Sequence, residues 1–318
     1  MKTAPSSQTV TLTASVPEHC AGMRLDQVLV ALFPQYSRSR LQAWSKDGRV
    51  TVDAAPLRPR DRLAGGETVR IAAAEDEQGP WRGEVMPLHV VYEDSALIVV
   101  DKPAGLVVHP AAGHHGGTLV NALLHYAPEL SRLPRAGIVH RLDKDTTGLM
   151  VVARTLESHA DLVAQIQARR VRREYLALVY GELLAGGRVS APVGRHPVQR
   201  QRMAVTPTGK EAATDYRVLE RYQGFTLVRA ILETGRTHQI RVHMAHLRHP
   251  VVGDPVYGRL RLPKDAGDAL RELLRGCKRP ALHAERLSLI HPGSGATLEW
   301  RARPPPDMQH LLSELRER

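Results

Sequence analysis

Two carboxylates lie within a short basic segment near the middle of the 318-residue chain. Asp143 and Asp145 stand among His140, Arg141 and Lys144. A carboxylate that is held between strands and surrounded by cations stays ionised, which suits a nucleophile or a group that stabilises positive charge. Two neighbouring carboxylates can also divide acid and base roles. An aspartate that only caps a turn is the structural alternative.

The flanking residues predict the elements that position this segment. Ile138 and Val139 are typical of the end of a buried strand, and residues 149–153 are typical of the start of another. The chain must turn between them, and Gly148 suits a tight backbone there. Both aspartates are therefore expected at a turn between two strands.

Two further segments carry residues of the kind found in active sites. Arg173-Glu174-Tyr175 follows a helix predicted over residues 156–170, and Glu233-Thr-Gly-Arg-Thr-His-Gln-Ile-Arg-Val-His243 continues to Gly-Asp-Pro at 253–255. Together with His-Arg-Leu-Asp at 140–143, they resemble the signature of the pseudouridine synthases that modify ribosomal RNA. Three motifs in the right order are far more specific than one. The resemblance runs from about residue 88 to the C-terminus.

The resemblance implies a reaction without a cofactor, in which the N-glycosidic bond of a uridine breaks and the uracil rotates and rejoins through carbon. It places catalysis on Asp143, an ion pair between Asp143 and Arg241, and base stacking with proton transfer on Tyr175. Leu282 would form the aliphatic wall of the uracil pocket, and Asp145 becomes a turn or surface residue. Attack on the sugar, attack on the uracil ring and elimination to a glycal all remain open for Asp143.

Other residues of these motifs are expected to contact RNA. A uridine inside a stem must leave its stack at a cost of a few kcal/mol, and Arg141 could fill the gap that it leaves. His140, Arg236 and His238 are expected to contact phosphates or the flipped nucleotide. Each could equally make local hydrogen bonds, just as Arg241, Tyr175 and Leu282 could be ordinary helix or strand residues.

Four histidines in one segment raise the possibility of a metal site. His238, His243, His246 and His249 crowd one segment, and two of them would share a helix face as zinc ligands often do. No third ligand is evident, no HExxH motif occurs, and His114-His115 stand alone in a Gly-rich segment. We therefore expect no metal.

The N-terminal part predicts two helices and two strands. Residues 25, 28, 29 and 32 are apolar at helical spacing. Ser37 can cap a second helix that turns Leu41 and Trp44 inward and ends at Gly48. Strands are expected near residues 49–53 and 67–71.

This unit resembles the S4 RNA-binding domain in Arg-Leu-Asp at 24–26, Ser-Arg-Ser-Arg-Leu at 37–41 and Gly-Arg-Val at 48–50. Arg38, Arg40 and Lys46 would lie largely on the outside of the second helix, where they could hold phosphates. A solvated helix face is the alternative.

The boundaries follow from these units: a flexible start over residues 1–17, an S4-like domain over 18–74, a linker over 75–87 and a catalytic domain over 88–318. The linker contains an acidic segment with Gly-Pro. Strands outnumber helices in the catalytic domain and often follow one another directly. This predicts an α+β fold with a mixed, mostly antiparallel sheet. Residues 259–278 look like a partly helical insertion.

Composition limits the function classes. A net charge of +11 and a pI near 10.0 favour an anionic partner, and nucleic acid fits better than membrane because no long amphipathic basic helix is evident. Only two cysteines occur, with no apolar signal core and no apolar run of ~20 residues. We expect a monomer in the cytoplasm. A 4% aromatic content disfavours a glycoside hydrolase.

Within the family, the chain resembles the branch that acts on the large ribosomal subunit. This predicts isomerisation of several uridines in one 23S ribosomal RNA stem-loop at the subunit interface, helix 69. Other 23S or transfer RNA uridines remain alternatives. So does a ribosome assembly factor without catalysis, against which the intact Asp143, Tyr175 and Arg241 argue.

Overall fold

The computed structural model describes residues 9–33, 36, 38–74, 81–109, 116–199 and 202–317, with only the backbone described at 9, 10, 38–40, 73 and 74. By its internal contacts the chain divides into two compact units. One comprises residues 1–84 and 123–136, and the other comprises residues 85–122 and 137–318. Within the described ranges, no helix combines the length and apolar character needed to span a bilayer.

The first unit contains an antiparallel sheet in the order β1-β4-β2-β3, formed by Thr9–Ser15, Thr68–Ala74, Val50–Val52 and Ala55–Pro56. Helices α1 (Leu25–Leu32) and α2 (Arg38–Lys46) share its core. Leu41 and Trp44 are buried as predicted.

The flexible start predicted over residues 1–17 is wrong from residue 9 onward, because β1 pairs with β4 over its whole length. Its alternating threonines and apolar residues favour a strand. Ser37 and the linker residues 75–80 lie outside the described residues, as do the side chains of Arg38 and Arg40. Lys46 is exposed.

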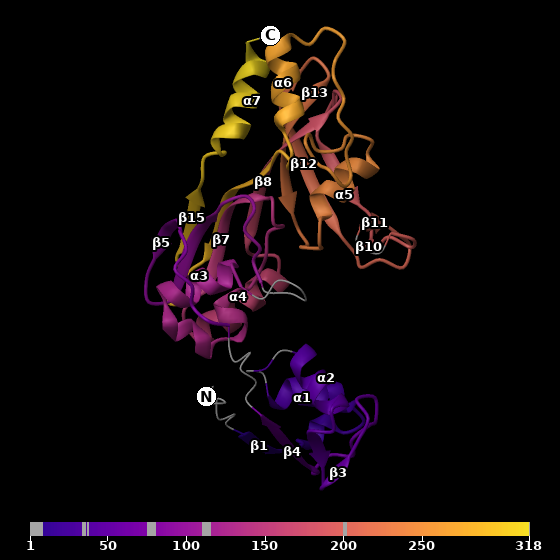
Figure 1. Ribbon diagram of the computed structural model, residues 1–318, viewed down its shortest axis with the longest axis vertical. Coiled ribbons are helices and arrows are strands. Elements are labelled where there is room, and N and C mark those ends of the chain that lie inside the picture. Colours follow the sequence, from indigo (N-terminus) through magenta and orange to yellow (C-terminus); the bar gives the residue numbers. More distant parts are fainter. Residues whose placement is uncertain are drawn as a thin grey trace, which may run out of the picture. The chain divides into compact units, whose positions relative to one another are not determined.

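The second unit is built on one mixed sheet in the order β5-β6-β7-β14-β8-β13-β12-β9, with β15 paired to β14 (Figure 1). Of the described strand pairs in it, only β7 and β14 run parallel. The predicted α+β class with a mixed, mostly antiparallel sheet is confirmed. The strands are β5 (Val90–Glu93), β6 (Leu97–Lys102), β7 (Thr147–Ala153), β8 (Arg172–Tyr180), β9 (Gly187–Ser190), β12 (Ala213–Tyr222), β13 (Phe225–Leu232), β14 (Leu282–Ile290) and β15 (Thr297–Arg301).

The remaining described elements of the chain are a hairpin, five helices and three short turns. The strands β10 (Val193–Arg195) and β11 (Met203–Val205) form a separate hairpin. The helices are α3 (Leu119–Tyr126), α4 (Leu156–Gln167), α5 (Gln239–His246), α6 (Asp268–Gly276) and α7 (Pro306–Arg316). Short 3-10 turns occupy Glu18–Cys20, Pro128–Arg132 and Pro134–Gly137.

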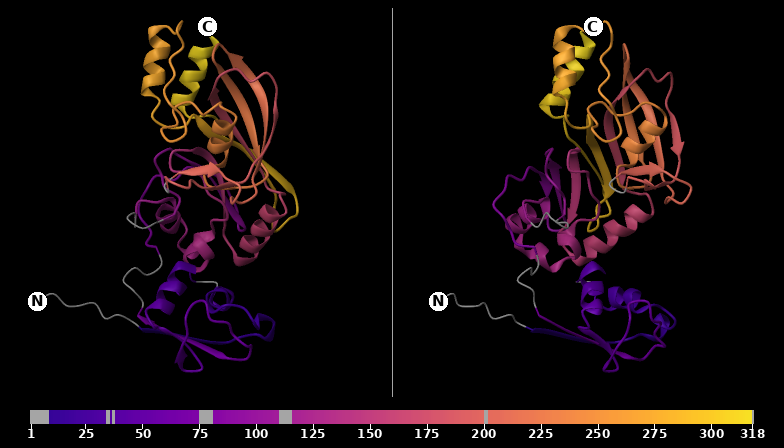
Figure 2. Two further views of the ribbon diagram at one scale, coloured as in Figure 1. Left: turned by 90° about the vertical axis from the view of Figure 1, so that its right-hand side faces the viewer. Right: turned by 45° about the vertical axis from the view of Figure 1, so that its right-hand side comes forward.

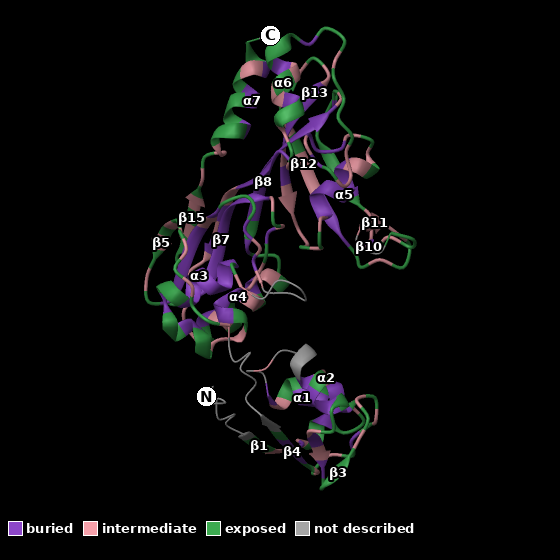
Figure 3. Cartoon of the chain, viewed as in Figure 1, coloured by how far each residue is buried: buried purple, intermediate pink, exposed green. Residues whose placement is uncertain are grey.

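Two helices cover one face of the sheet at one of its ends. In all three views α6 and α7 run side by side (Figures 1 and 2). They share a core with Leu176 and Leu178 of β8 and with Phe225 of β13. Because side chains alternate along a strand, Arg173 and Tyr175 of β8 point to the opposite face. Figure 3 shows β7 and β8 as buried strands in the middle of this sheet.

Some local predictions were wrong. Ile138 does not end a strand and makes only an isolated bridge with Val152. His238, the residue directly before α5, takes a left-handed conformation with φ of 57°, and its side chain makes no capping hydrogen bond. The start of α5 is fixed by the buried Gln239 amide, which accepts from Arg236 N at 3.0 Å and donates to the carbonyl of Ala213 at 2.9 Å.

Gly148 belongs to β7 rather than to the turn before it. Its φ is 113°, and a Cβ there would lie 2.3 Å from the carbonyl oxygen of Ala284 on β14. No L side chain fits both the backbone conformation and this contact. The parallel pairing of β7 with β14 therefore depends on this glycine.

We expect Gly148→Ala to lower the free energy of unfolding by about 3 kcal/mol, because the new methyl group meets backbone that cannot move aside. Gly105→Ala is the control, since Gly105 also has a positive φ of 80° but nothing within 4 Å. It should cost about 1 kcal/mol from backbone strain alone. Urea denaturation of both variants measures the difference, and equal losses would contradict the close packing.

Candidate active site

A buried lysine holds the segment that carries Asp143 in place. Lys102, at the end of β6, is 1% exposed. Its ammonium group donates to the carbonyls of Lys144 at 2.8 Å, Pro103 at 2.7 Å and Leu106 at 3.0 Å. Burial lowers the pKa of Lys102 to about 8, although the nearby Asp145 and Asp143 act against this change. The sequence analysis does not single out Lys102, which is the last residue of this strand.

Arg241 of α5 bridges two carboxylates. Its Nη1 donates to Asp143 Oδ2 at 3.1 Å, while Nε and Nη2 donate to the two carboxylate oxygens of Asp254 at 2.7 and 2.9 Å. The exposed fractions of the Arg241, Asp254 and Asp143 side chains are 7%, 0% and 18%. The predicted pair of Asp143 and Arg241 is present, and a second carboxylate accompanies it.

In this bridge, the interaction of Arg241 with Asp254 shifts the pKa of each residue toward its charged form. Burial opposes the charge on Arg241, but the hydrogen bonds and charges of Asp254 and Asp143 outweigh it, so the pKa of Arg241 is raised. Burial likewise opposes ionisation of Asp254, but the Arg241 hydrogen bond and charge leave its pKa lowered. Asp254 Oδ1 also accepts the backbone N–H groups of Val256 and Tyr257 at 2.9 and 3.1 Å. A fixed carboxylate therefore orients the guanidinium that faces Asp143.

His238 lies on the other side of Asp143, with Nε2 3.9 Å from Asp143 Oδ2. Its Nδ1 is 2.7 Å from the hydroxyl of Tyr257, which also accepts the backbone N–H of Met203 at 2.9 Å. Burial lowers the pKa of His238 although Asp143 raises it, which favours a neutral imidazole. The arrangement favours the tautomer in which Tyr257 donates to Nδ1 and Nε2–H faces Asp143.

Tyr175 stands in a row of small residues across the sheet. Ala284 of β14 and Ala230 of β13 lie directly opposite it, and Gly148 of β7 lies opposite Ala284. Residues opposed in this way share one face, so no side chain larger than methyl stands beside Tyr175 in the row. Burial raises the pKa of Tyr175, with Arg173 opposing the rise and Asp143 adding to it. Leu282 lies on the same face opposite Ala177, and is 4% exposed.

The other residues that were predicted to contact RNA differ in their exposure and in their hydrogen bonds. Arg141 is exposed beside Asp143. His140 is half-buried and its Nε2 accepts the backbone N–H of Val151 at 3.1 Å. Burial, helped by the charge of Arg173, lowers the pKa of His140 to about 3. Arg236 is half-buried and donates to the carbonyl of Glu211 at 3.0 Å.

The histidines of the metal hypothesis have separate partners. His243 bonds to the Thr214 hydroxyl and the Ala191 carbonyl, both at 2.9 Å, and His249 bonds to the Tyr180 carbonyl at 2.8 Å. In the described ranges, no group of three or more His, Cys, Asp or Glu side chains could hold a metal ion. His114 and His115 lie outside those ranges.

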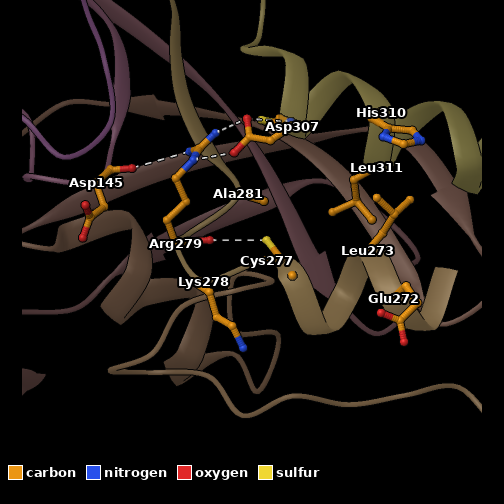
Figure 4. Close-up of a pocket in the computed structure, with 12 residues that line it drawn as sticks. Asp145, Glu272, Leu273, Cys277, Lys278, Arg279, Ala281, Asp307, His310 and Leu311 are labelled. Carbon is orange, nitrogen blue, oxygen red and sulfur yellow. Dashed lines mark hydrogen bonds and ion pairs between the residues drawn. The ribbon is translucent and has the colours of Figure 1, made fainter. Parts of the chain in front are cut away.

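A cavity of about 660 Å³ lies beside the segment that follows Asp143 (Figure 4). It is lined by Asp145, by Arg279 and by residues of α6 and α7. Arg279 donates to both carboxylate oxygens of Asp307 at 2.7 and 2.6 Å and approaches the carbonyl of Asp145 at 3.5 Å. Asp145 thus lines this cavity, whereas Asp143 and Arg241 do not. No ion pair joins Asp145 to Arg241 in the described part of the chain.

Comparisons with known proteins fit this geometry. The family model described as RNA pseudouridylate synthase matches residues 96–246, and the S4 domain model matches residues 23–69. A Pseudomonas aeruginosa protein named ribosomal large subunit pseudouridine synthase D is 55% identical over 98% of both chains. The chain belongs to the RNA pseudouridine synthase family.

Other relatives agree with this assignment. The synthase is 52% identical to the Escherichia coli K12 protein of the same name, over 98% of this chain and 96% of that one. Among solved structures, human RNA pseudouridylate synthase domain containing 4 superposes with a TM-score of 0.56 at 25% identity, covering 72% of this chain and 93% of that chain. Human RNA pseudouridylate synthase domain containing 1 gives 0.53 at 28% identity, covering 70% and 86%. The synthase therefore carries an S4 domain and a pseudouridine synthase domain.

Asp254→Asn tests the second carboxylate. The amide removes the charge that orients Arg241, and a misplacement of about 1 Å can lower a rate about 100-fold. We expect the single-turnover rate of the synthase to fall by about this factor while RNA affinity stays within about threefold.

Asp268→Asn is the control, because its side chain is 99% exposed and lies 3.6 Å from Arg271. It should leave the rate unchanged. If Asp254→Asn also keeps the wild-type rate, Asp254 does not orient Arg241 for the reaction.

Proposed function

We propose that this enzyme isomerises specific uridines of 23S ribosomal RNA to pseudouridine, in the intersubunit stem-loop helix 69. The target is supported by the shared name of relatives that are 52–55% identical over nearly the whole chain. The net charge of +11 suits a large RNA substrate. We further propose that the enzyme acts as a monomer in the cytoplasm and needs no metal or cofactor.

The observation that carries the mechanism is the single guanidinium that joins Asp143 to Asp254. We propose Asp143 as the catalytic carboxylate, which is held in place by Arg241 and is partly exposed. It would attack the sugar, attack the uracil ring or assist elimination. The flipped base would stack on Tyr175, in the space left by Ala230 and Ala284.

The remaining residues would bring the uridine to Asp143. Arg141 is exposed two residues before Asp143, where it could replace the extruded base in the stem. Leu282 would bound the base at its edge. His238 would contact the nucleotide through Nε2, whereas the bonds of His140 and Arg236 to backbone leave them less free to do so.

We propose that the S4 domain binds the same RNA through α2. Lys46 is exposed at the end of this helix, in the part of α2 whose side chains are described. A tethered basic domain raises the effective concentration of RNA at the catalytic domain without changing the chemistry.

Asp143→Asn should abolish tritium release from 23S ribosomal RNA labelled with 5-tritiated uridine, because the amide cannot act as a nucleophile or stabilise positive charge. RNA affinity should remain within about threefold, since most contacts with the phosphates lie elsewhere. Mapping the modified positions tests the helix 69 target. Release by wild type from transfer RNA alone would overturn that target, and tight binding without any release would favour the assembly factor.

Lys46→Gln tests the S4 domain. We expect a weaker affinity and a slope of log affinity against log salt that is smaller by about 0.9, the contribution of about one phosphate contact. The rate at saturating RNA should not change. Lys264→Gln is the control, since Lys264 is also exposed but lies in the catalytic domain. An unchanged salt slope for Lys46→Gln would remove this residue from the RNA interface.

A further inference from the structure

Arg173 is a buried cation for which the described residues provide no hydrogen-bond or ion-pair partner. Its side chain lies on β8 and is 6% exposed. Across the described ranges it makes no hydrogen bond or ion pair, and its Nε is buried without an acceptor. Removing a guanidinium from water costs several kcal/mol unless acceptors replace the lost hydration. A buried polar group left in this state calls for an explanation.

The neighbouring carboxylate cannot supply that acceptor. Glu174 is 1% exposed on the opposite face of β8, where Arg172, Arg229 and Arg286 approach it at 2.5, 3.4 and 3.6 Å. One carboxylate there serves three arginines. On the face that carries Arg173, no described carboxylate forms an ion pair with it.

The guanidinium of Arg173 belongs to the active site. Arg173 and Tyr175 are two residues apart on the same face of β8, so their Cα atoms are separated by roughly 7 Å. A Cβ on Gly235 would lie 3.0 Å from Arg173 Nη1, and Gly235 belongs to the segment that leads to His238 and Arg241. The charge of Arg173 also lowers the pKa of His140 and opposes the raised pKa of Tyr175.

We propose that Arg173 donates hydrogen bonds to a carbonyl oxygen of the flipped uracil and stabilises the negative charge that the base acquires during the reaction. This inference rests on the proposed function. The missing acceptor of Arg173 is then supplied by the substrate. Asp143 faces the positive charge that develops on the sugar, and Arg173 faces the negative charge on the base.

The charge on the base does not depend on the route. When the bond between C1′ and N1 breaks, its electron pair stays on N1 and spreads to O2 and O4. When a carboxylate adds to C6 of the ring, the electron pair moves to O4, and the bond between the carboxylate and C6 breaks again before the product forms. After C5 has bonded to C1′, the C5 proton leaves and N1 takes up one proton, so the product is an isomer. Donors fixed toward such an oxyanion are each worth about 100-fold or more in rate.

Arg173→Gln should lower the single-turnover rate on labelled ribosomal RNA about 100-fold. RNA affinity should stay within about threefold of wild type, because the charge on the base is small before reaction. Arg172→Gln is the control, since it is the next arginine along β8 but points to the opposite face and is 54% exposed. It should keep the wild-type rate. Arg173→Gln should unfold at the same temperature as wild type or higher, because an unpaired buried charge has been removed.

A substrate with 5-fluorouridine at the target position decides the role. Fluorine stabilises negative charge on the ring, so Arg173 should matter less for this nucleoside. The rate at which the target nucleoside disappears from RNA digests should fall in Arg173→Gln by a factor that is at least tenfold smaller for 5-fluorouridine than for uridine. A phosphate contact or a structural role would lower both rates by the same factor.

Three outcomes would overturn the assignment. They are a wild-type rate in Arg173→Gln, equal factors for the two nucleosides, and a loss confined to RNA affinity. Inactivity of wild type itself would instead show that the proposed function fails, and the inference about Arg173 with it.

Discussion

The catalytic domain is organised around one buried guanidinium that serves two carboxylates. Arg241 gives two donors to Asp254, which is completely buried, and one to Asp143, which is partly exposed. The buried pair fixes the guanidinium, and the remaining donor then fixes Asp143, the carboxylate that we propose as catalytic. Burying any one of these three charges without its partner would cost free energy, so the three residues stabilise one geometry together.

The sheet brings these residues together from distant parts of the sequence. Asp143 precedes β7, and β7 can lie against β14 only because Gly148 has no side chain. Ala284 and Ala230 keep the neighbouring positions small around Tyr175. Helices α6 and α7 cover the opposite face, which leaves this face to the site. The residues 259–278, which looked like an insertion, contribute α6 and thus part of that cover.

The sequence predicted the fold class from its succession of strands and helices, and its resemblance to a known family implied the pair of Asp143 with Arg241. It did not predict Asp254, since nothing in the sequence shows that a carboxylate 13 residues after Arg241 returns to it through a turn. Lys102 was missed because its partners are backbone carbonyls, which leave no trace in residue types. Gly148 was assigned to a turn because local patterns do not reveal an approach to a strand 136 residues later.

The most direct test of the central bridge is the single-turnover rate of Arg241→Lys on 23S ribosomal RNA at saturating enzyme. A lysine keeps the charge but has one nitrogen, so it cannot bond to both carboxylates in fixed directions. We expect the rate to fall about 100-fold with RNA affinity unchanged. A rate within about threefold of wild type would contradict the bridge as the basis of the site, because charge alone would then be sufficient.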